Sequence, residues 1–405
     1  MKTRLPQTVI VLGVVSFLTD FSSDMIYPLL PVFLSSVLGA GAVALGLIEG
    51  IAESAASLLK LASGIWTDRL RRRKPFLLAG YGLAGAARPL IGLAAAWPFV
   101  LFLRFWDRVG KGLRASPRDA LIADVTDARQ RGAAFGLHRA MDHAGAVAGP
   151  LTAAALLSIP GVSLRGVFLL AAVPAAAVML VLLLFIKEKR SAAPSPGESG
   201  GASGGAADEP RSQPAWLGWG ALSPQLRLLL AAVFVFTLGN STDAFLLLRL
   251  KEAGLPAASL ALLWALHHVV RMVSTYAGGR LADRAGRRRL VLSGWAFYAA
   301  VYLAFGWARS PAALVAVFLA YGLYFGLTEP AEKAWVADLA PAGRRGRAFG
   351  FYHLMVGLGA LPASLLFGLL WQAFGAIAAF TTGAAFAMLA SILLLARPGR
   401  RAAGL

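Results

Sequence analysis

Cysteine is absent from the 405-residue chain, which excludes a disulfide framework and a thiolate metal site. Charged residues are scarce, at 15% of the chain, against about 25% in soluble domains. Acidic residues are the scarcer kind, with 20 against 39 basic ones. The net charge of +19 would fit a nucleic-acid partner. In a membrane protein, however, basic residues mark cytoplasmic loops, so we expect no nucleic-acid partner.

The sequence is instead rich in long apolar runs. Hydrophobic residues make up 58% of the chain, and its mean hydropathy is +0.67. Runs of roughly 20 apolar residues are long enough to cross about 30 Å of hydrocarbon. We therefore predict an all-α membrane protein with twelve transmembrane helices, at residues 8–33, 43–65, 76–96, 98–119, 134–158, 165–187, 226–248, 257–280, 290–308, 312–335, 348–370 and 375–396.

Basic residues fall into alternate loops between the predicted helices. One set of loops contains RLRRRK (69–74), DARQRG (127–132), KEKR (187–190) and DRAGRRR (283–289), whereas the opposite set carries little basic charge. By the positive-inside rule, both termini are cytoplasmic. We expect a multi-pass protein in the lipid bilayer of the bacterial cytoplasmic (inner) membrane.

The two halves of the chain are sequence repeats of each other. GIWTDRLRRRK at Gly64 returns as GRLADRAGRRR at Gly279, and ADVTDARQRGAAFG at Ala123 returns as ADLAPAGRRGRAFG at Ala337, at nearly the same offset. We predict two pseudo-symmetric six-helix halves, 1–190 and 225–405, joined by a cytoplasmic linker at 191–224 that is rich in Gly, Ser, Ala and Pro. Repeats of this kind place a site between the halves near the midplane.

These repeated motifs resemble those of the major facilitator superfamily over nearly the whole chain. The loop motif G-x-x-x-D-R-x-G-R-R matches from Gly279 to Arg288, and its first-half copy has Arg71 in place of the usual glycine. The resemblance implies a monomeric transporter of a small molecule, similar to bacterial proton-coupled exporters of drugs or metabolites.

The resemblance also implies a gate. In this family the loop motif locks the cytoplasmic side while the cavity faces outward. A carboxylate at a helix end can meet the positive N-terminus of a facing helix, and glycine allows close helix packing. The implied gate residues are Gly64, Asp68, Arg69, Arg72 and Asp124, with Gly279, Asp283, Arg284 and Asp338 in the second half. For the arginines, a plain topology signal is the alternative.

A second motif lies in the fifth predicted helix. GAVAGP, with Gly145, Gly149 and Pro150, resembles a motif of proton-coupled antiporters, although alanines at 153 and 154 stand in place of a glycine pair. A bent helix with a bare glycine face suits close contact between the two halves. Simple small-residue helix packing is the alternative.

Charge in the fourth predicted helix is confined to one face. At 100° per residue, Arg104, Asp107, Arg108, Lys111 and Arg114 fall in a stripe about 120° wide. Each basic residue near the membrane centre costs on the order of 3 kcal/mol in lipid. Four would cost roughly 12 kcal/mol, comparable to a domain's net stability. The stripe therefore faces water or carboxylates. Arg118 and Asp119, nearer the helix end, are expected to be interfacial.

Intramembrane carboxylates are candidates for proton coupling. Burial raises the pKa of a carboxylate and a nearby arginine lowers it, so a moving arginine changes proton affinity. We rank Asp20 first, then Glu53 and Asp142, with Asp24 and Glu49 after them. The alternative is an internal salt-bridge network that pins the helices.

The basic stripe also bears on the substrate. Arginine binds carboxylate and phosphate groups, which indicates an anionic or zwitterionic compound. The neighbouring acids balance these bases, however, so a cationic or amphipathic substrate stays open. The candidate cavity residues are Arg104, Arg108, Lys111, Arg139, Phe21, Tyr27, Asp243, Trp264, Tyr324 and Glu329.

These features together predict a secondary active transporter that exports a small organic compound by proton antiport. A proton symporter importing a small organic anion is the alternative. An enzyme would need a nucleophile, metal set or cofactor motif. His138 and His143 are about 140° apart around a helix and do not converge on a metal. We expect no enzyme activity, cofactor or metal. A non-transporting scaffold or receptor on this fold would be excluded by substrate-driven flux.

Overall fold

The computed structural model describes residues 5–30, 33–39, 56, 58–70, 72–186, 218–255 and 257–395. Glu49, Glu53 and most of the predicted linker lie outside the described residues. Within them, every regular element is a helix. The arrangement confirms the predicted all-α fold of two helical halves.

The first half is a bundle of mostly apolar helices. Prolines in the first turns of α4 and α5 help to start those helices, because an N-terminal proline gives up no helical hydrogen bond. In order, the elements are α1 (Gln7–Asp24), η1 (Tyr27–Leu29), η2 (Phe33–Val37), a helical segment at 58–70, α4 (Lys74–Leu90), η3 (Ile91–Leu93), α5 (Trp97–Val125), η4 (Ala128–Gln130), α6 (Arg131–Leu157), α7 (Leu164–Leu170) and α8 (Ala172–Phe185).

The second half repeats this plan. Its last long helix contains Gly375 at a φ of 83°, where two helices meet at a kink that only glycine adopts easily. The elements are η5 (Gly218–Ala221), α9 (Pro224–Gly239), α10 (Ala244–Glu252), α11 (Ala257–Ala285), α12 (Arg287–Trp307), α13 (Pro311–Leu339), η6 (Ala342–Arg344) and α14 (Arg345–Leu395).

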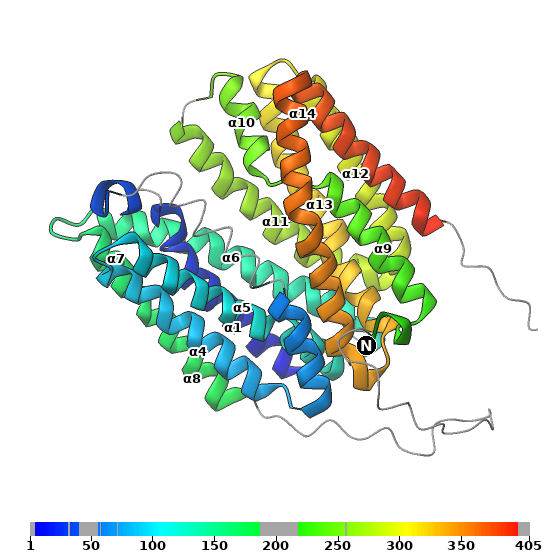
Figure 1. The fold of residues 1–405 in the computed structure, drawn as a ribbon, viewed down its shortest axis with the longest axis horizontal. Helices are drawn as coiled ribbons and strands as arrows, with labels where there is room; N and C mark the ends of the chain where they lie inside the picture. The colour runs from blue at the N-terminus through cyan, green and yellow to red at the C-terminus, as the bar shows by residue number, and fades with distance from the viewer. Residues whose placement is uncertain are drawn as a thin grey trace, which may run out of the picture.

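The two bundles lie side by side and meet along one boundary (Figure 1). α6 packs against α11 and α13 there, and α5 packs against α14. Both bundles come together at the lower right of Figure 1, where the repeated motifs lie, and separate toward the upper left. We call the joined end, which carries residues 64–74, 123–132, 279–288 and 337–347, the motif end.

Charge distinguishes the helices at this boundary from those around it. The described segments that are long and apolar enough to cross a membrane are Gln7–Leu29, Lys74–Leu93, Leu164–Phe185, Arg287–Trp307, Pro311–Leu339 and Arg345–Leu395. α5, α6 and α11 are also long, with 29, 27 and 29 residues, but they carry more charged side chains. Their place at the boundary lets those charges meet partners instead of lipid.

The seventh predicted helix is broken. We predicted one helix over 226–248, but α9 ends at Gly239 and α10 begins at Ala244. The residues between them are Asn, Ser, Thr and Asp, whose side chains compete with helical backbone bonds. α1 is interrupted in a similar way, because it ends at Asp24 and is followed by the short η1 helix. Each half therefore breaks its first helix beside an aspartate, Asp24 or Asp243.

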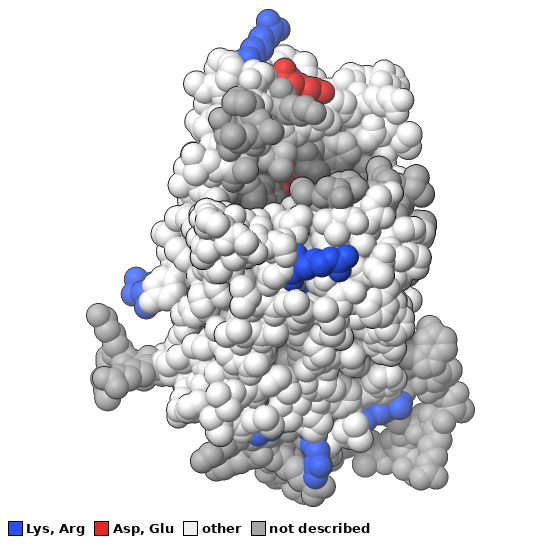
Figure 2. Space-filling model, turned by 90° about the vertical axis from the view of Figure 1, so that its left-hand side faces the viewer, with Lys and Arg blue, Asp and Glu red and all other residues white. Residues whose placement is uncertain are grey.

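The end opposite the motif end is hollowed between the two bundles (Figure 2). Acidic atoms are visible inside the hollow, although this face of the molecule carries few other charges. The structure is therefore closed between its halves at the motif end and open at the other end.

Candidate functional site

The motif end is closed by two related carboxylate contacts. Asp283, at the end of α11, accepts hydrogen bonds from the backbone N–H groups of residues 132 and 133, at 2.9 and 2.8 Å. These residues form the first turn of α6. Asp68 accepts corresponding bonds from residues 346 and 347 in the first turn of α14, at 3.0 and 2.6 Å. The predicted meeting of each aspartate with a facing helix N-terminus is confirmed, while its role as a gate stays a prediction.

Glycine makes these contacts possible. A Cβ atom on Gly64 would lie 2.1 Å from the carbonyl oxygen of Gly346, and one on Gly279 would lie 2.3 Å from that of Gly132. Both distances are far below van der Waals contact, and the obstructing atoms are backbone. The close approach predicted for Gly64 and Gly279 is therefore confirmed.

Burial and hydrogen bonding oppose each other at the two aspartates, which lie beyond the predicted membrane spans. Burial raises the pKa of Asp68, and Arg73 and the facing N–H groups counteract that rise. Burial also raises the pKa of Asp283, against the N–H groups of Ala133 and Gly132. The closed end therefore holds two desolvated carboxylates that depend on the facing helices for their hydrogen bonds.

Ion pairs between the halves surround these contacts. Arg345 of the second half pairs with Asp124 of the first at 2.7 Å, and Arg131 of the first half pairs with Asp338 of the second at 2.5 Å. Asp124 and Asp338 are thus placed in the network as the sequence predicted.

The arginines predicted for this network are the wrong ones. Arg69, Arg72 and Arg284 are exposed, and they make no ion pair with any residue that the structure describes. Arg73 instead pairs with Asp68 and Asp124, each at 3.1 Å. Arg287 pairs with Asp283 at 3.2 Å and with Asp338 at 2.7 Å. The reason is helical geometry: Arg69 and Arg284 follow their aspartates by one residue and point about 100° away.

A second closed layer lies deeper in the boundary. Asp119 of α5 is fully buried, 2.8 Å from the Lys333 ammonium of α13 and 3.0 Å from His353 Nε2 of α14. The prediction that Asp119 is interfacial was wrong, because the second half covers this part of α5. Arg118 also pairs with Asp119, at 3.0 Å.

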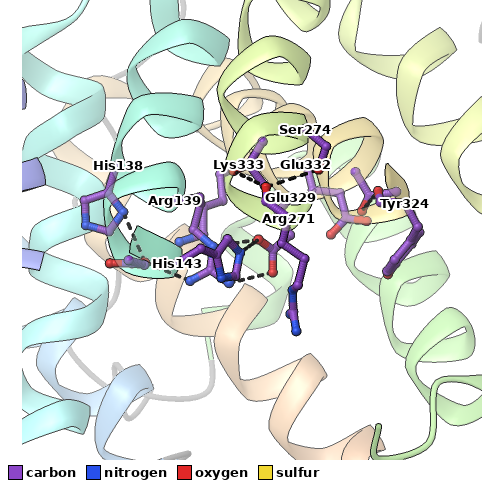
Figure 3. Close-up of polar contacts among 12 residues, drawn as sticks. His138, Arg139, His143, Arg271, Ser274, Tyr324, Glu329, Glu332 and Lys333 are labelled. Atoms are coloured by element: carbon purple, nitrogen blue, oxygen red, sulfur yellow. Dashed lines mark hydrogen bonds and ion pairs between the residues drawn. The ribbon is translucent and has the colours of Figure 1, made fainter. Parts of the chain in front are cut away.

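The Arg139–Glu329 pair forms the third layer, nearer the middle of the helices. Arg139 donates two hydrogen bonds to the Glu329 carboxylate, one from Nε and one from Nη2, each at 2.6 Å. Figure 3 shows Arg139 and His143 of α6 directed toward Glu329 of α13, with His143 at 3.9 Å. The two side chains of the pair are 23% and 21% exposed, so water reaches this layer.

Asp142 extends this layer into the first half. Arg139 also donates to Asp142 at 2.9 Å. Ser16 of α1 donates a short hydrogen bond to Asp142 and lies 3.0 Å from His138 Nε2. One arginine thus bridges a carboxylate in each half, and α1 is attached to the same cluster.

We predict strong energetic coupling between Arg139 and Glu329. Arg139→Gln leaves two carboxylates without their cation, so it should cost more stability than Glu329→Gln. In a double-mutant cycle on the free energy of unfolding in an SDS titration, the coupling energy should be about 2 kcal/mol or more. Pairing Arg139→Gln with Asp127→Asn, an exposed loop position, is the control and should be additive within about 0.5 kcal/mol. Additivity in the Arg139–Glu329 cycle itself would show that the pair does not hold the halves together.

The basic stripe of α5 is turned inward, as predicted. Arg104, Asp107 and Arg114 are 3%, 1% and 5% exposed. Asp107 binds Arg88 of α4 at 2.8 Å and Arg104 at 3.1 Å. Arg114 lies over the ring of Tyr81, 4.5 Å from its centroid. This part of the stripe is an internal network that holds α4 against α5.

Asp20 and Asp24 differ from these paired acids. Neither carboxylate makes a hydrogen bond or an ion pair to any residue in the described ranges, and both are partly exposed. Their surroundings are charged nevertheless. Asp20 feels the fields of Asp142, Asp24, Arg88 and Arg114, and Asp24 feels those of Arg88, Lys111, Arg108 and Arg104. They can take up a proton or a cation without first breaking an ion pair.

The predicted cavity residues separate into two groups. Phe21, Tyr27, Arg108, Lys111, Arg139, Asp243, Trp264 and Glu329 are all at least partly exposed. Arg104 and Tyr324 are buried, so the prediction that they line a cavity was wrong. Arg104 is drawn to Asp107, and Tyr324 packs among Phe236, Tyr298 and Tyr321.

Asp243 marks the corresponding position in the second half. It lies in the break between α9 and α10, accepts from the Tyr321 hydroxyl at 3.0 Å and pairs with Arg271 at 3.4 Å. The Arg271 guanidinium also lies over the Phe325 ring, 3.4 Å from its centroid. Unlike Asp24, Asp243 is held by a cation.

The glycines of the GAVAGP motif pack within one half. A Cβ atom on Gly145 would lie 2.4 Å from the Phe17 carbonyl oxygen, and one on Gly149 would lie 2.7 Å from that of Phe21. Both neighbours belong to α1, so the predicted contact across the two halves was wrong. The glycines bring α6 close to α1 beside Asp20. Residues 132 and 136 of α6 are the glycines that contact the other half.

Sequence reasoning missed Lys333, Glu332 and Arg73. Lys333 and Glu332 lie in the predicted tenth helix beside Glu329, so the rule that flagged Glu329 would have found them. Glu332 accepts from Trp295 Nε1 at 3.0 Å and from the Tyr352 hydroxyl at 2.9 Å. The described residues contain no group of three or more His, Asp or Glu side chains that could hold a metal ion.

Comparison with known proteins agrees with this architecture. The sequence model of the Major Facilitator Superfamily matches residues 12–284 and 250–404. An uncharacterized MFS-type transporter of Methanocaldococcus jannaschii is 32% identical over 398 residues, 97% of this chain and 95% of the relative. The multi-drug resistance efflux pump PmrA of Streptococcus pneumoniae is 24% identical over 85% of this chain and 84% of its own length. The crystal structure of the human organic anion transporter MFSD10 shares the fold, with a TM-score of 0.78 at 20% identity over 96% of this chain and all of that one.

Proposed function

Because the chain belongs to the Major Facilitator Superfamily of membrane transporters, we propose that it exports a small organic compound in exchange for protons, by alternating access. One observation carries the proposal. Ion pairs close the boundary from the motif end to Arg139–Glu329, while Asp20 and Asp24 are carboxylates without a bonded partner in the described part of the chain.

The layered boundary provides the moving part. Opening the motif end requires the three layers, at Asp68 and Asp283, at Asp119, and at Arg139, to separate. Arg139 links Glu329 across the boundary to Asp142, which lies beside Asp20. A proton on Asp20 changes the charge next to Asp142, and this alters how strongly Arg139 is held between the two carboxylates. Protonation is thereby coupled to separation of the halves.

The orientation follows from the distribution of basic loops. The basic loops that the structure describes lie at the motif end, which the positive-inside rule assigns to the cytoplasm. The state in Figures 1 and 2 is then open to the outside, where a proton can enter the hollow and reach Asp20. For export, the carrier must bind a proton and release its substrate in this outward-open state. It must then return to the inward-open state with the proton bound.

The charge balance favours a neutral or cationic amphipathic compound. Asp107 pairs with both Arg88 and Arg104, and Arg139 pairs with both Glu329 and Asp142, so that three carboxylates balance three guanidinium groups across the two clusters. The unpaired carboxylates Asp20 and Asp24 can then attract a cationic group, which competes with protons for the same position. The similarity to PmrA, a multi-drug resistance efflux pump, agrees with export of a small organic compound.

A ligand panel followed by flux tests the proposal. Purified protein is screened by thermal shift against cationic, neutral and anionic organic compounds, and the compounds that bind are tested in proteoliposomes. We expect cationic or neutral amphipathic compounds to bind and to accumulate when the vesicle interior is acidic. Accumulation of an anion driven by an alkaline interior would support the symporter alternative. Binding without any flux would contradict transport altogether.

A further inference from the structure

The outer side of α11 carries a groove whose lining includes no residue of the three ion-pair layers. It has a volume of about 730 Å³ and lies between α11, α12 and α13. Its walls include Leu281, Leu323 and Phe297, and its motif-end rim carries Arg280 and Arg284. The opposite side of α11 packs against α6 through Gly279. The groove therefore faces the membrane, away from the hollow between the halves.

Close helix packing creates this groove. A Cβ atom on Gly278 would lie 1.8 Å from the carbonyl oxygen of Gly326, so α11 and α13 cross in backbone contact. Larger residues on either side of the crossing leave a channel along the helices. From Ser274 to Arg284 the groove extends about 15 Å along α11, by the rise of 1.5 Å per residue. That length accommodates most of an acyl chain in one leaflet, whose hydrocarbon is about 15 Å thick.

The two arginines give the groove a charged end. Arg280 and Arg284 are one helical turn apart and both are exposed. Among the described residues, Arg280 hydrogen-bonds to the Tyr276 hydroxyl, and its guanidinium lies 4.3 Å from the Tyr276 ring centroid. The neighbouring acid Asp283 is turned to α6 and to Arg287. No carboxylate in the described part of the chain neutralises either arginine.

We propose that this groove binds an anionic phospholipid, with its phosphate between Arg280 and Arg284 and one acyl chain along the apolar walls. Guanidinium groups bind phosphate oxygens bidentately. Basic pockets between transmembrane helices on the cytoplasmic side are suited to anionic headgroups. The apolar walls select a lipid over a soluble phosphate compound, because only a lipid fills the charged rim and the channel together.

Native mass spectrometry of the detergent-purified protein tests this site. Phosphatidylglycerol should bind more tightly than phosphatidylcholine. Arg280→Gln/Arg284→Gln should weaken phosphatidylglycerol binding by a factor of about 30, from about 1 kcal/mol for each arginine. It should weaken phosphatidylcholine binding less, because the choline cation offsets the charge of the phosphate. Ala277→Phe, which fills the groove without removing charge, should weaken binding of both lipids.

A matched control separates this site from general basic charge. Arg289→Gln/Arg344→Gln removes two exposed arginines at the same end of the molecule, outside the groove. It should keep the affinity for phosphatidylglycerol. An equal loss in the control, or unchanged phosphatidylglycerol binding in the groove variants, would overturn the proposal. All five positions named for substitution are exposed, and the melting temperatures of the variants without added lipid should match that of the parent protein.

Discussion

Asp20→Asn is expected to abolish accumulation driven by a pH gradient while leaving the binding and equilibrium exchange of a neutral substrate intact. The amide is close in size to the carboxyl group but cannot release or take up a proton. Asp20 has no hydrogen-bonded or ion-paired partner among the described residues. It also lies next to the cluster around Asp142. The measurement compares gradient-driven uptake with exchange of labelled substrate across proteoliposomes at equal pH.

Two comparisons make this result specific. Asp127→Asn removes an exposed carboxylate in the loop before α6 and should accumulate substrate like the parent protein. Asp142→Asn removes an acid that Arg139 and Ser16 hold, so it should lower both stability and transport. If Asp20→Asn still accumulated substrate against its gradient, Asp20 would not be the proton carrier.

Gly279→Leu is expected to move the protein out of the state that is closed at the motif end. Even the Cβ atom would collide with the Gly132 carbonyl oxygen and with Gly136, and these backbone atoms can yield only if α6 and α11 separate. Overpacking costs about 1–3 kcal/mol or more, which shifts a two-state equilibrium by a factor of about 5 to 150. The rate of transport should also fall, because the state that is closed at the motif end becomes rare.

Spin-label distances measure this shift directly, since the chain has no native cysteine. Labels at residues 72 and 344 report on the motif end, and labels at 159 and 309 report on the open end; all four positions are exposed. Gly279→Leu should lengthen the first distance and shorten the second. Gly220→Leu, where an added Cβ atom meets no atom within 4 Å, should change neither. Unaltered distances in Gly279→Leu would contradict a gate at this contact.

The sequence predicts those parts of the molecule that repeat or follow from helix periodicity. The matching motifs at Gly64 and Gly279 correctly predicted two aspartates facing helix N-termini, because the same packing problem occurs in each half. The one-sided stripe of α5 correctly predicted that Arg104 and Arg114 face away from lipid, because a charged face in lipid is too costly.

Partners across a tertiary boundary could not be predicted in this way. Choosing Arg73 over Arg72 depends on how the chain turns after residue 70, which periodicity does not determine. Asp119 appeared interfacial because its distance from the helix end was counted along α5 alone, whereas α13 and α14 bury it. The GAVAGP glycines could pack on either neighbour of α6, and their spacing did not reveal that α1 takes that place.

The most direct test of the account is the direction in which protons move when substrate leaves a vesicle. Proteoliposomes loaded with a transported compound and a pH-sensitive dye are diluted into compound-free buffer at equal pH, and the internal pH is followed. Antiport predicts that the interior becomes acidic as protons enter in exchange for substrate, in either orientation of the protein, and that Asp20→Asn removes this signal. Alkalinisation of the interior, or efflux with no change in pH, would contradict proton antiport.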